Sequence, residues 1–342
     1  MESKRELDLG AAAVDRIYRL WQVDDAWSVR EHRGFSWWAG DFRQRVFVDA
    51  GRDDDGIFIY KLSAVTDLLR LVDPQEPALA ERLAALNRFS SSYALTLNVA
   101  ERQVRLCSSV VLHNQNADWI VPHFSALAII QPIDAQIRAR LWAEMLGGTL
   151  SESGHPGSGV RNEHDDMLNL IKDIYRPHGE EPSRWVTSRE FEQVSPLLVK
   201  EGSFSTGGRS GLSAEVSFGN DSALITANGD APHPQLGNGV LLLLHLPLTL
   251  SRAIAARWAV ELNSAEANAA GDLLGAWCSA EMRGGSIPVF ASFIPNSLYR
   301  PGLLFNMILS LGVKARWACN EIAPYMEDDD LESVLRRRYG AL

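Results

Sequence analysis

The feature that most constrains this chain is a motif that recurs half a chain length later. The stretch ERLAALN ends at Asn87 and RWAVELN ends at Asn263, and each Leu-Asn pair closes a helical pattern that leads into a strand-like one. Arg140 and Arg316, each preceded by Ala, are separated by the same number of residues. A constant offset at two places predicts two homologous domains in this chain of 342 residues.

Both halves show the same order of predicted elements, α-β-β-β-α-β-β-α. Apolar residues three or four positions apart indicate helices, and alternating or continuous apolar runs between turn residues indicate strands. In the first half, helices are predicted at residues 10–21, 77–87 and 123–146, and strands within 34–50, 57–62, 93–99 and 104–112. In the second half, helices are predicted at residues 165–176, 251–263 and 299–322, and strands at 211–218, 222–227, 239–246, 273–279 and 286–293. Pro132 is expected to kink or interrupt the helix that contains it.

The boundaries of the domains follow from composition. Residues 147–164 are rich in Gly, Ser and polar residues, which is typical of a linker. We therefore predict an α+β protein with a first domain at residues 1–146, a linker at 147–164, a second domain at 165–326 and a helical tail at 327–342. Each domain is expected to hold an antiparallel sheet packed by helices.

This element order, with its antiparallel sheet, resembles the class I type III secretion chaperone fold that the YbjN-like proteins share. The run GFSWWAGDFRQRVFVDAGRDDDGIFIYKL is also similar to actinobacterial proteins of unassigned function. The resemblance implies a small, acidic, cytoplasmic protein that binds extended segments of partner proteins without catalysis. Because members of that class are typically homodimeric, two copies in one chain imply a fused pseudo-dimer.

The net charge and the cysteine content limit the classes of partner and the cellular compartments that we expect. The net charge is −10 and the isoelectric point is about 5.3, which argues against nucleic acid as the main partner. The polar start MESKRELDLG has no apolar core of a secretory signal, and the apolar run at residues 240–250 is too short to span a bilayer. Three cysteines without a C-x-x-C motif fit a reducing cytoplasm. We expect a cytoplasmic protein that binds neither nucleic acid nor membrane.

Adjacent tryptophans mark the first candidate site. On a strand, Trp37 and Trp38 face opposite sides of the sheet, so at most one of them can point into the core of its own domain. With Arg43 and Arg45 on a polar face nearby, the other could bind a partner protein, since aromatic residues are frequent at binding hot spots. The alternative is that it covers a domain interface or packs against a helix.

The start of the last predicted helix offers a weaker candidate. Asn296, Ser297 and Arg300 lie where a helix N-terminus with an arginine can hold an anion such as phosphate or a carboxylate. Ordinary capping of the helix explains the same residues.

The sequence contains no motif for catalysis, metal or cofactor binding. The acidic triplet in RDDDG is contiguous, unlike the spaced ligands of a calcium loop, and its position between two strands favours a turn. None of the eight histidines shows the spacing of a metal site, and no G-x-S-x-G, P-loop or G-x-G-x-x-G motif is present.

The leading hypothesis is therefore a non-catalytic protein, a chaperone or an adaptor, that binds an extended segment of a partner at a strand edge or in an apolar helix groove. The chain would act as a pseudo-dimeric monomer or as a homodimer. The alternative is an enzyme or a small-molecule binder whose site lies between the two domains and uses residues dispersed in the sequence.

Overall fold

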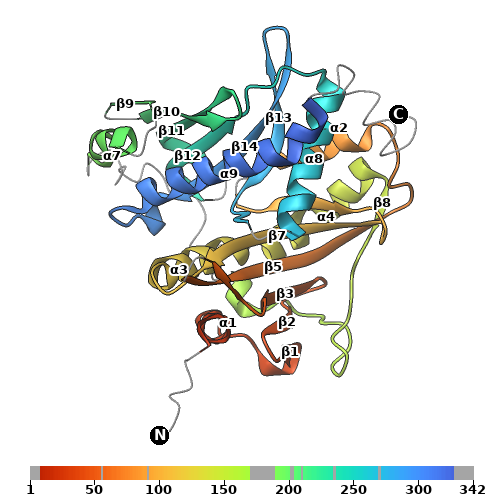
Figure 1. Cartoon of the computed structure of the whole chain (residues 1–342). Coiled ribbons are helices and arrows are strands. Elements are labelled where there is room, and N and C mark those ends of the chain that lie inside the picture. The colour runs from red at the N-terminus through yellow and green to blue at the C-terminus, as the bar shows by residue number, and fades with distance from the viewer. Residues whose placement is uncertain are drawn as a thin grey trace, which may run out of the picture. The chain divides into compact units, whose positions relative to one another are not determined.

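The computed structural model describes residues 8–54, 57–90, 92–169, 189–200, 204–208, 211–233, 236–268 and 271–326. Figure 1 shows the chain with its elements labelled. The chain forms two compact units, and each consists of three segments. Unit 1 contains Met1–Pro74, Ser92–Ile174 and Ser264–Leu274, and unit 2 contains Gln75–Ser91, Tyr175–Asn263 and Gly275–Leu342.

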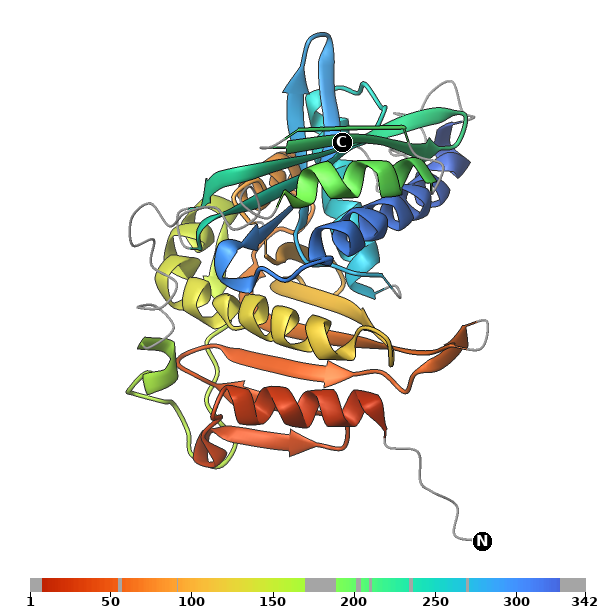
Figure 2. The same cartoon turned by 90° about the vertical axis from the view of Figure 1, so that its left-hand side faces the viewer.

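Unit 1 is an antiparallel sheet with helices on one face. Its helices are α1 (Leu9–Leu20), α3 (Ala117–Ala128) and α4 (Ile130–Leu146), with a short 3-10 helix at Asp25–Trp27. Its strands are β1 (Ser28–Glu31), β2 (Gly34–Trp38), β3 (Arg43–Val48), β4 (Arg52–Asp54), β5 (Ile57–Leu71), β6 (Ala94–Asn98), β7 (Gln103–Leu112) and β8 (Gly148–Leu150). Figure 2 shows α1 in red and the yellow helices α3 and α4 side-on against strands of this sheet.

Unit 2 has a second antiparallel sheet, which α7 (Glu190–Lys200) and α9 (Leu303–Met326) cover. Its strands are β9 (Phe204–Gly208), β10 (Gly211–Phe218), β11 (Asp221–His233), β12 (Gly237–His245), β13 (Ala276–Met282) and β14 (Gly285–Pro295). Helix α2 (Leu79–Asn87) packs against β13. Helix α8 (Arg252–Asn268) belongs to unit 2 up to Asn263, and a 3-10 helix at Asn296–Leu298 precedes α9.

The two sheets have the same strand order. It is β1-β2-β3-β5-β7-β6 in unit 1 and β9-β10-β11-β12-β14-β13 in unit 2, so the last two strands of each half exchange places in the same way. In unit 1, β4 and β8 also pair with β5, outside this common path. The predicted α+β class and the two similar halves are thus confirmed.

Several local predictions differ from the structure. An additional edge strand, β1 or β9, precedes the three predicted strands of each half, and Arg52–Asp54, predicted as a turn, form β4. The helix α7 was not predicted. The predicted helix at 165–176 lies largely outside the described residues, and the predicted tail at 327–342 lies wholly outside them.

The interruption near Pro132 is confirmed, because α3 ends at Ala128 and α4 begins at Ile130. Pro132 has no N–H group, so it cannot bond to the carbonyl of Ala128 four residues earlier. The side chain of Gln44 donates to that carbonyl instead, with an Nε2–O distance of 2.8 Å.

The compact units do not follow the linear division at residues 147–164. Residues 75–91, which include α2, belong to unit 2, and residues 264–274 belong to unit 1. The predicted linker is built into unit 1, where β8 pairs with the end of β5. None of the helices in the described ranges combines the length and the apolar character needed to cross a membrane.

Candidate functional site

Trp37 is a core residue of unit 1. Its side chain is 0% exposed and packs against Trp21, the residue that follows α1, with the ring centroids 5.7 Å apart. It therefore presents no surface to a partner. Replacing it with Ala would open a cavity in the core, so a double Trp37/Trp38 variant would not isolate a binding defect.

Trp38 faces the other side of the sheet, as expected for adjacent residues on a strand. It is nevertheless only 4% exposed, because residues 151–165, from the predicted linker and the residue after it, cover it. Its indole Nε1 donates to Ser153 Oγ over 3.1 Å, and the ring of His155 meets it edge-on at 5.1 Å. Arg161 donates to the Trp38 carbonyl over 2.9 Å. We call residues 151–165 the strap.

The two arginines of the candidate partner-binding site, Arg43 and Arg45, have different surroundings. Arg43 forms an ion pair with Asp67 and its side chain is 42% exposed. Arg45 pairs with Glu31 at 2.6 Å and lies over the ring of Phe47. The structure thus brings Trp38 and Arg43 together in one groove, whereas Trp37 and Arg45 do not line it.

This groove, which we call the arginine groove, runs between the outer face of the sheet of unit 1 and the start of the strap. It has a volume of about 700 Å3. Its lining comes from β2, β3, β5, β7, β8 and the strap: Trp38, Arg43, Asp67, Arg70, Gln103, Thr149, Leu150, Ser151, Glu152, Ser153, Gly154 and Pro156. Polar side chains dominate this lining, so the groove is suited to a polar, extended ligand.

A second segment of the chain lies on the same sheet. Ser109 of β7 and Leu273 form an antiparallel bridge, with N–H to carbonyl bonds of 2.8 and 3.2 Å in the two directions. Ser109 Oγ donates to the carbonyl of Gly271 over 3.1 Å, and the Val111 N–H donates to the carboxylate of Asp272. Residues 271–273 thus extend the sheet beyond the end of β6.

Lys61 holds the helix end that precedes this segment. Its Nζ donates to the carbonyls of Glu266 and Ala267, at 2.8 and 2.7 Å, in the last turn of α8. A lysine at this position satisfies carbonyls that a helix leaves unpaired. Burial lowers the pKa of Lys61 to about 8, and the nearby Glu266 partly opposes this shift.

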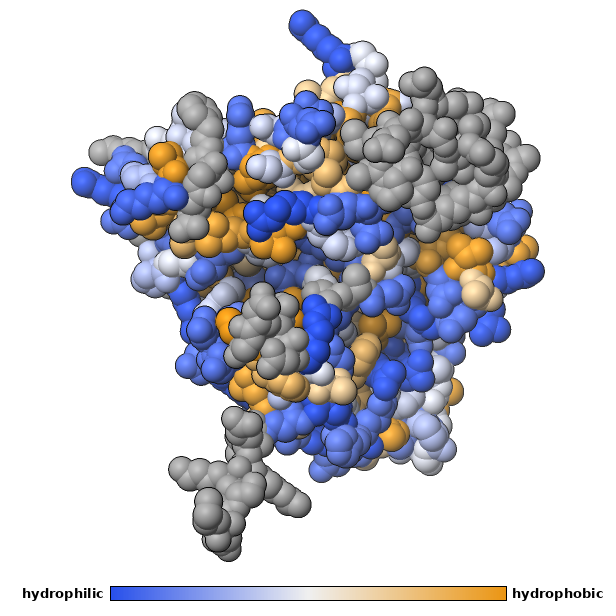
Figure 3. Space-filling model, viewed as in Figure 1, coloured by the Kyte–Doolittle hydropathy of each residue, from blue (hydrophilic) through white to orange (hydrophobic). Residues whose placement is uncertain are grey.

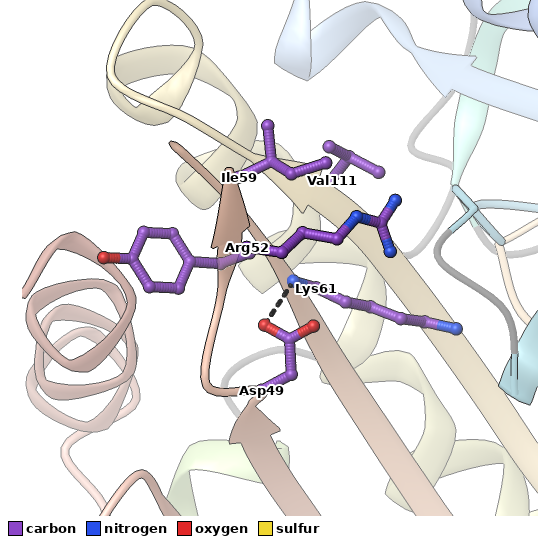
Figure 4. Close-up of a pocket in the computed structure, with 6 residues that line it drawn as sticks. Asp49, Arg52, Ile59, Lys61 and Val111 are labelled. Carbon is purple, nitrogen blue, oxygen red and sulfur yellow. Dashed lines mark hydrogen bonds between the residues drawn. The ribbon is translucent and has the colours of Figure 1, made fainter. Parts of the chain in front are cut away.

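Figure 4 shows the small pocket beside Lys61. Asp49 accepts from the Lys61 main-chain N–H over 2.9 Å, while the lysine side chain extends away from it, alongside Arg52. The cavity of about 10 Å3 has room for roughly one water molecule. Since the amine is bonded to two carbonyls and the pocket is too small for an organic substrate, Lys61 has a structural role here.

The start of α9 meets a carboxylate of its own unit. The Gly302 N–H donates to Glu190 Oε1 over 3.0 Å, beside the residues that the sequence offered as a weaker candidate for an anion site. Burial raises the pKa of Glu190, and bonds from the Gly302 and Leu304 N–H groups and from Tyr299 oppose the shift. Asn296 and Ser297 lie in the preceding 3-10 helix, and the Asn296 side chain is buried. Arg300, which precedes α9, is exposed.

The second copy of the Leu-Asn motif has a structural role that the sequence did not reveal. Asn263 is fully buried, and its amide donates to the Trp277 carbonyl and accepts from the Trp277 N–H, both at 2.8 Å. It thereby pairs with the edge strand β13 as a neighbouring strand would. The next residue, Ser264, donates to the carbonyl and accepts from the N–H of Leu97 in β6, both at 3.3 Å. The sequence signal that could have indicated this role is a polar residue at the end of an apolar helical face, directly before a predicted strand.

Cys107 and Cys278 are free and buried. Burial raises the pKa of Cys107 and of Cys278 to about 11, so both thiols are protonated near neutral pH. Among the residues that the structure describes, no group of three or more His, Cys, Asp or Glu side chains is arranged to hold a metal ion. Comparisons of the chain with protein-family models, with curated proteins and with solved structures found no match.

Proposed function

We propose that this chain is a cytoplasmic, non-catalytic protein of chaperone or adaptor type that holds an extended segment of a partner protein on the sheet of unit 1. One observation carries the proposal. In addition to the six strands whose order both sheets share, this sheet already binds two short extended segments from elsewhere in its own chain. These segments are β8 and residues 271–273.

Both segments use main-chain bonds, the interaction by which strand addition binds peptides of varied sequence. β8 pairs with β5 over Leu69–Leu71, and the Ser151 N–H continues the pairing by donating to the Leu68 carbonyl over 2.9 Å. Residues 271–273 pair with β7 through Ser109. A sheet with these properties is suited to receive a further extended chain.

The resemblance to secretion chaperones agrees with this proposal. The two units share a strand order, as expected of a fused pseudo-dimer, and the net charge of −10 fits the acidic character of that class. We accordingly propose that the chain acts as a pseudo-dimeric monomer whose partner is a protein segment.

The test is capture of partners by the tagged full-length protein from a lysate of its source organism, followed by cross-linking and mass spectrometry. The proposal predicts a stoichiometric partner whose cross-links fall near β5, β7 and residues 148–156. Recovery of partnerless protein, together with a melting temperature raised by a metabolite, would instead support a small-molecule binder or an enzyme.

A further inference from the structure

We propose that the arginine groove selects an acidic extended segment, whose carboxylates pair with Arg43 and Arg70. This inference rests on the proposed function and adds the site and the chemistry of the partner. On the face shown in Figure 3, exposed apolar side chains occur as several small groups among hydrophilic ones. The lining of the groove is itself mainly polar and charged, so it favours charged and polar recognition.

An irregularity of β5 places Arg70 in the groove. The pairing of β5 with β7 shifts register between Asp67 and Leu69. Regular alternation would put Asp67 and Arg70 on opposite faces of the sheet, but both line the groove. A β-bulge redirects side chains in this way, and bulges are frequent next to functional sites.

On its sheet side the groove carries two arginines, Arg43 and Arg70, and one acid, Asp67, while the strap contributes the second acid, Glu152. Asp67 pairs with Arg43 and also with Arg105, which has a second carboxylate partner in Glu101. Asp67 is only 13% exposed, whereas Arg43 is 42% exposed. Arg70 is exposed and forms no ion pair with any residue in the described ranges. In a chain of net charge −10, two exposed arginines on one floor form a local site for carboxylates.

The chain segment that already borders the groove shows what kind of ligand fits. Residues 149–154 have the sequence TLSESG, and β8 runs antiparallel to β5 at their start. The segment is extended and polar, and its Glu152 lines the groove with the two arginines. A partner segment with acids between small hydroxyl residues would present the same chemistry.

The experiment uses the full-length protein and two fluorescein-labelled peptides of about ten residues. One peptide alternates Glu and Ser, and the other has Gln at each Glu position. Fluorescence anisotropy at low salt should show binding of the Glu peptide, and roughly 0.5 M NaCl should weaken it because salt screens exposed charges. The double variant R43Q/R70Q should lose roughly tenfold or more in affinity.

The matched control is R45Q. Arg45 lies on the same strand and face as Arg43 and is 45% exposed, but it pairs with Glu31 outside the groove. This variant should bind the Glu peptide like the original protein, and circular dichroism checks that all variants are folded. Equal binding of both peptides, equal loss in R45Q, or no binding of the Glu peptide would overturn the inference. If cross-links from a captured partner still fall on unit 1, the proposed function stands and only the acidic specificity fails.

Discussion

The two units share a strand order but use different chemistry where the closing helix meets the sheet. In unit 1, α4 contributes Gln131, which is fully buried. In unit 2, the position separated from it by the offset of the repeat is Met307 of α9, which is also buried. A polar amide and a thioether thus stand at positions of the two closing helices that the repeat offset relates.

The amide in unit 1 connects four segments. Gln131 accepts from the Thr66 hydroxyl over 3.0 Å and donates to Ser108 Oγ over 2.8 Å. It also lies within 3.3 Å of the Gln44 amide and of the Ala64 carbonyl. A buried hydrogen-bond network of this kind fixes the position of a helix on a sheet, because a shifted helix would leave more polar groups without partners.

Unit 2 has a more apolar core with many aromatic residues. Its fully buried large side chains include Phe191, Phe218, Trp277, Phe290 and Phe293. The comparison indicates that hydrophobic patterning and turns are sufficient for this topology. The contact between the closing helix and the sheet can be polar in one copy and apolar in the other. The polar copy is also the one that carries the arginine groove.

The largest expected effect is the loss of the amide network. Gln131→Leu would leave the Thr66 hydroxyl and the Ala64 carbonyl with fewer partners in a buried site, at a cost of roughly 2–4 kcal/mol in the free energy of unfolding. Met307→Leu should cost less than about 1.5 kcal/mol because the volume is conserved. Urea unfolding followed by circular dichroism measures both, and equal losses would contradict the contrast between the two cores.

Removal of the edge-strand pairing should come next. Asn263→Leu removes the buried amide that bonds to the N–H and carbonyl of Trp277 and should cost about 2–3 kcal/mol. Asn268→Leu is the control on the same helix, since Asn268 donates at an exposed site and should change stability by less than about 1 kcal/mol. A neutral Asn263→Leu would show that β13 does not depend on this amide.

The third prediction concerns Lys61, whose pKa of about 8 lies below its ordinary value of 10.5. Between these pH values the unfolded chain binds more protons than the folded one, so the stability of the original protein rises with pH. Lys61→Met lacks this titration. Its stability deficit should therefore grow by roughly 1–3 kcal/mol from pH 8 to 10.5.

Thermal or urea unfolding across this pH range checks the difference between the two proteins. Lys200→Met, at an exposed position at the end of α7, serves as control and should show no such growth. A deficit that stays constant or shrinks would mean that the Lys61 amine is not buried against the end of α8.

The smallest expected change in stability belongs to Arg43→Gln. Its ion pair with Asp67 is partly exposed, so its loss should cost less than about 1 kcal/mol. Arg45→Gln should cost a similar amount, since its ion pair with Glu31 is also exposed. The two variants should therefore differ in peptide binding but not in their urea midpoints; a large difference in midpoints would assign Arg43 a structural role.

The sequence was sufficient for those features that depend on local pattern. Helical and alternating apolar spacing predicted most elements, and the missing N–H of Pro132 predicted the break between α3 and α4. The arginine groove depends instead on long-range contacts. No local pattern shows that residues 264–274 pack in unit 1, that the strap covers Trp38, or that a register shift turns Arg70 outward.

The measurement that tests the account most directly is hydrogen–deuterium exchange of the full-length protein, alone and bound to its captured partner. We expect the backbone amides in the last residues of β5 and in residues 148–156 to become protected on binding, with little change in the sheet of unit 2. Protection confined to unit 2, or no change in unit 1 despite a stoichiometric complex, would contradict the claim that the sheet of unit 1 receives the partner segment.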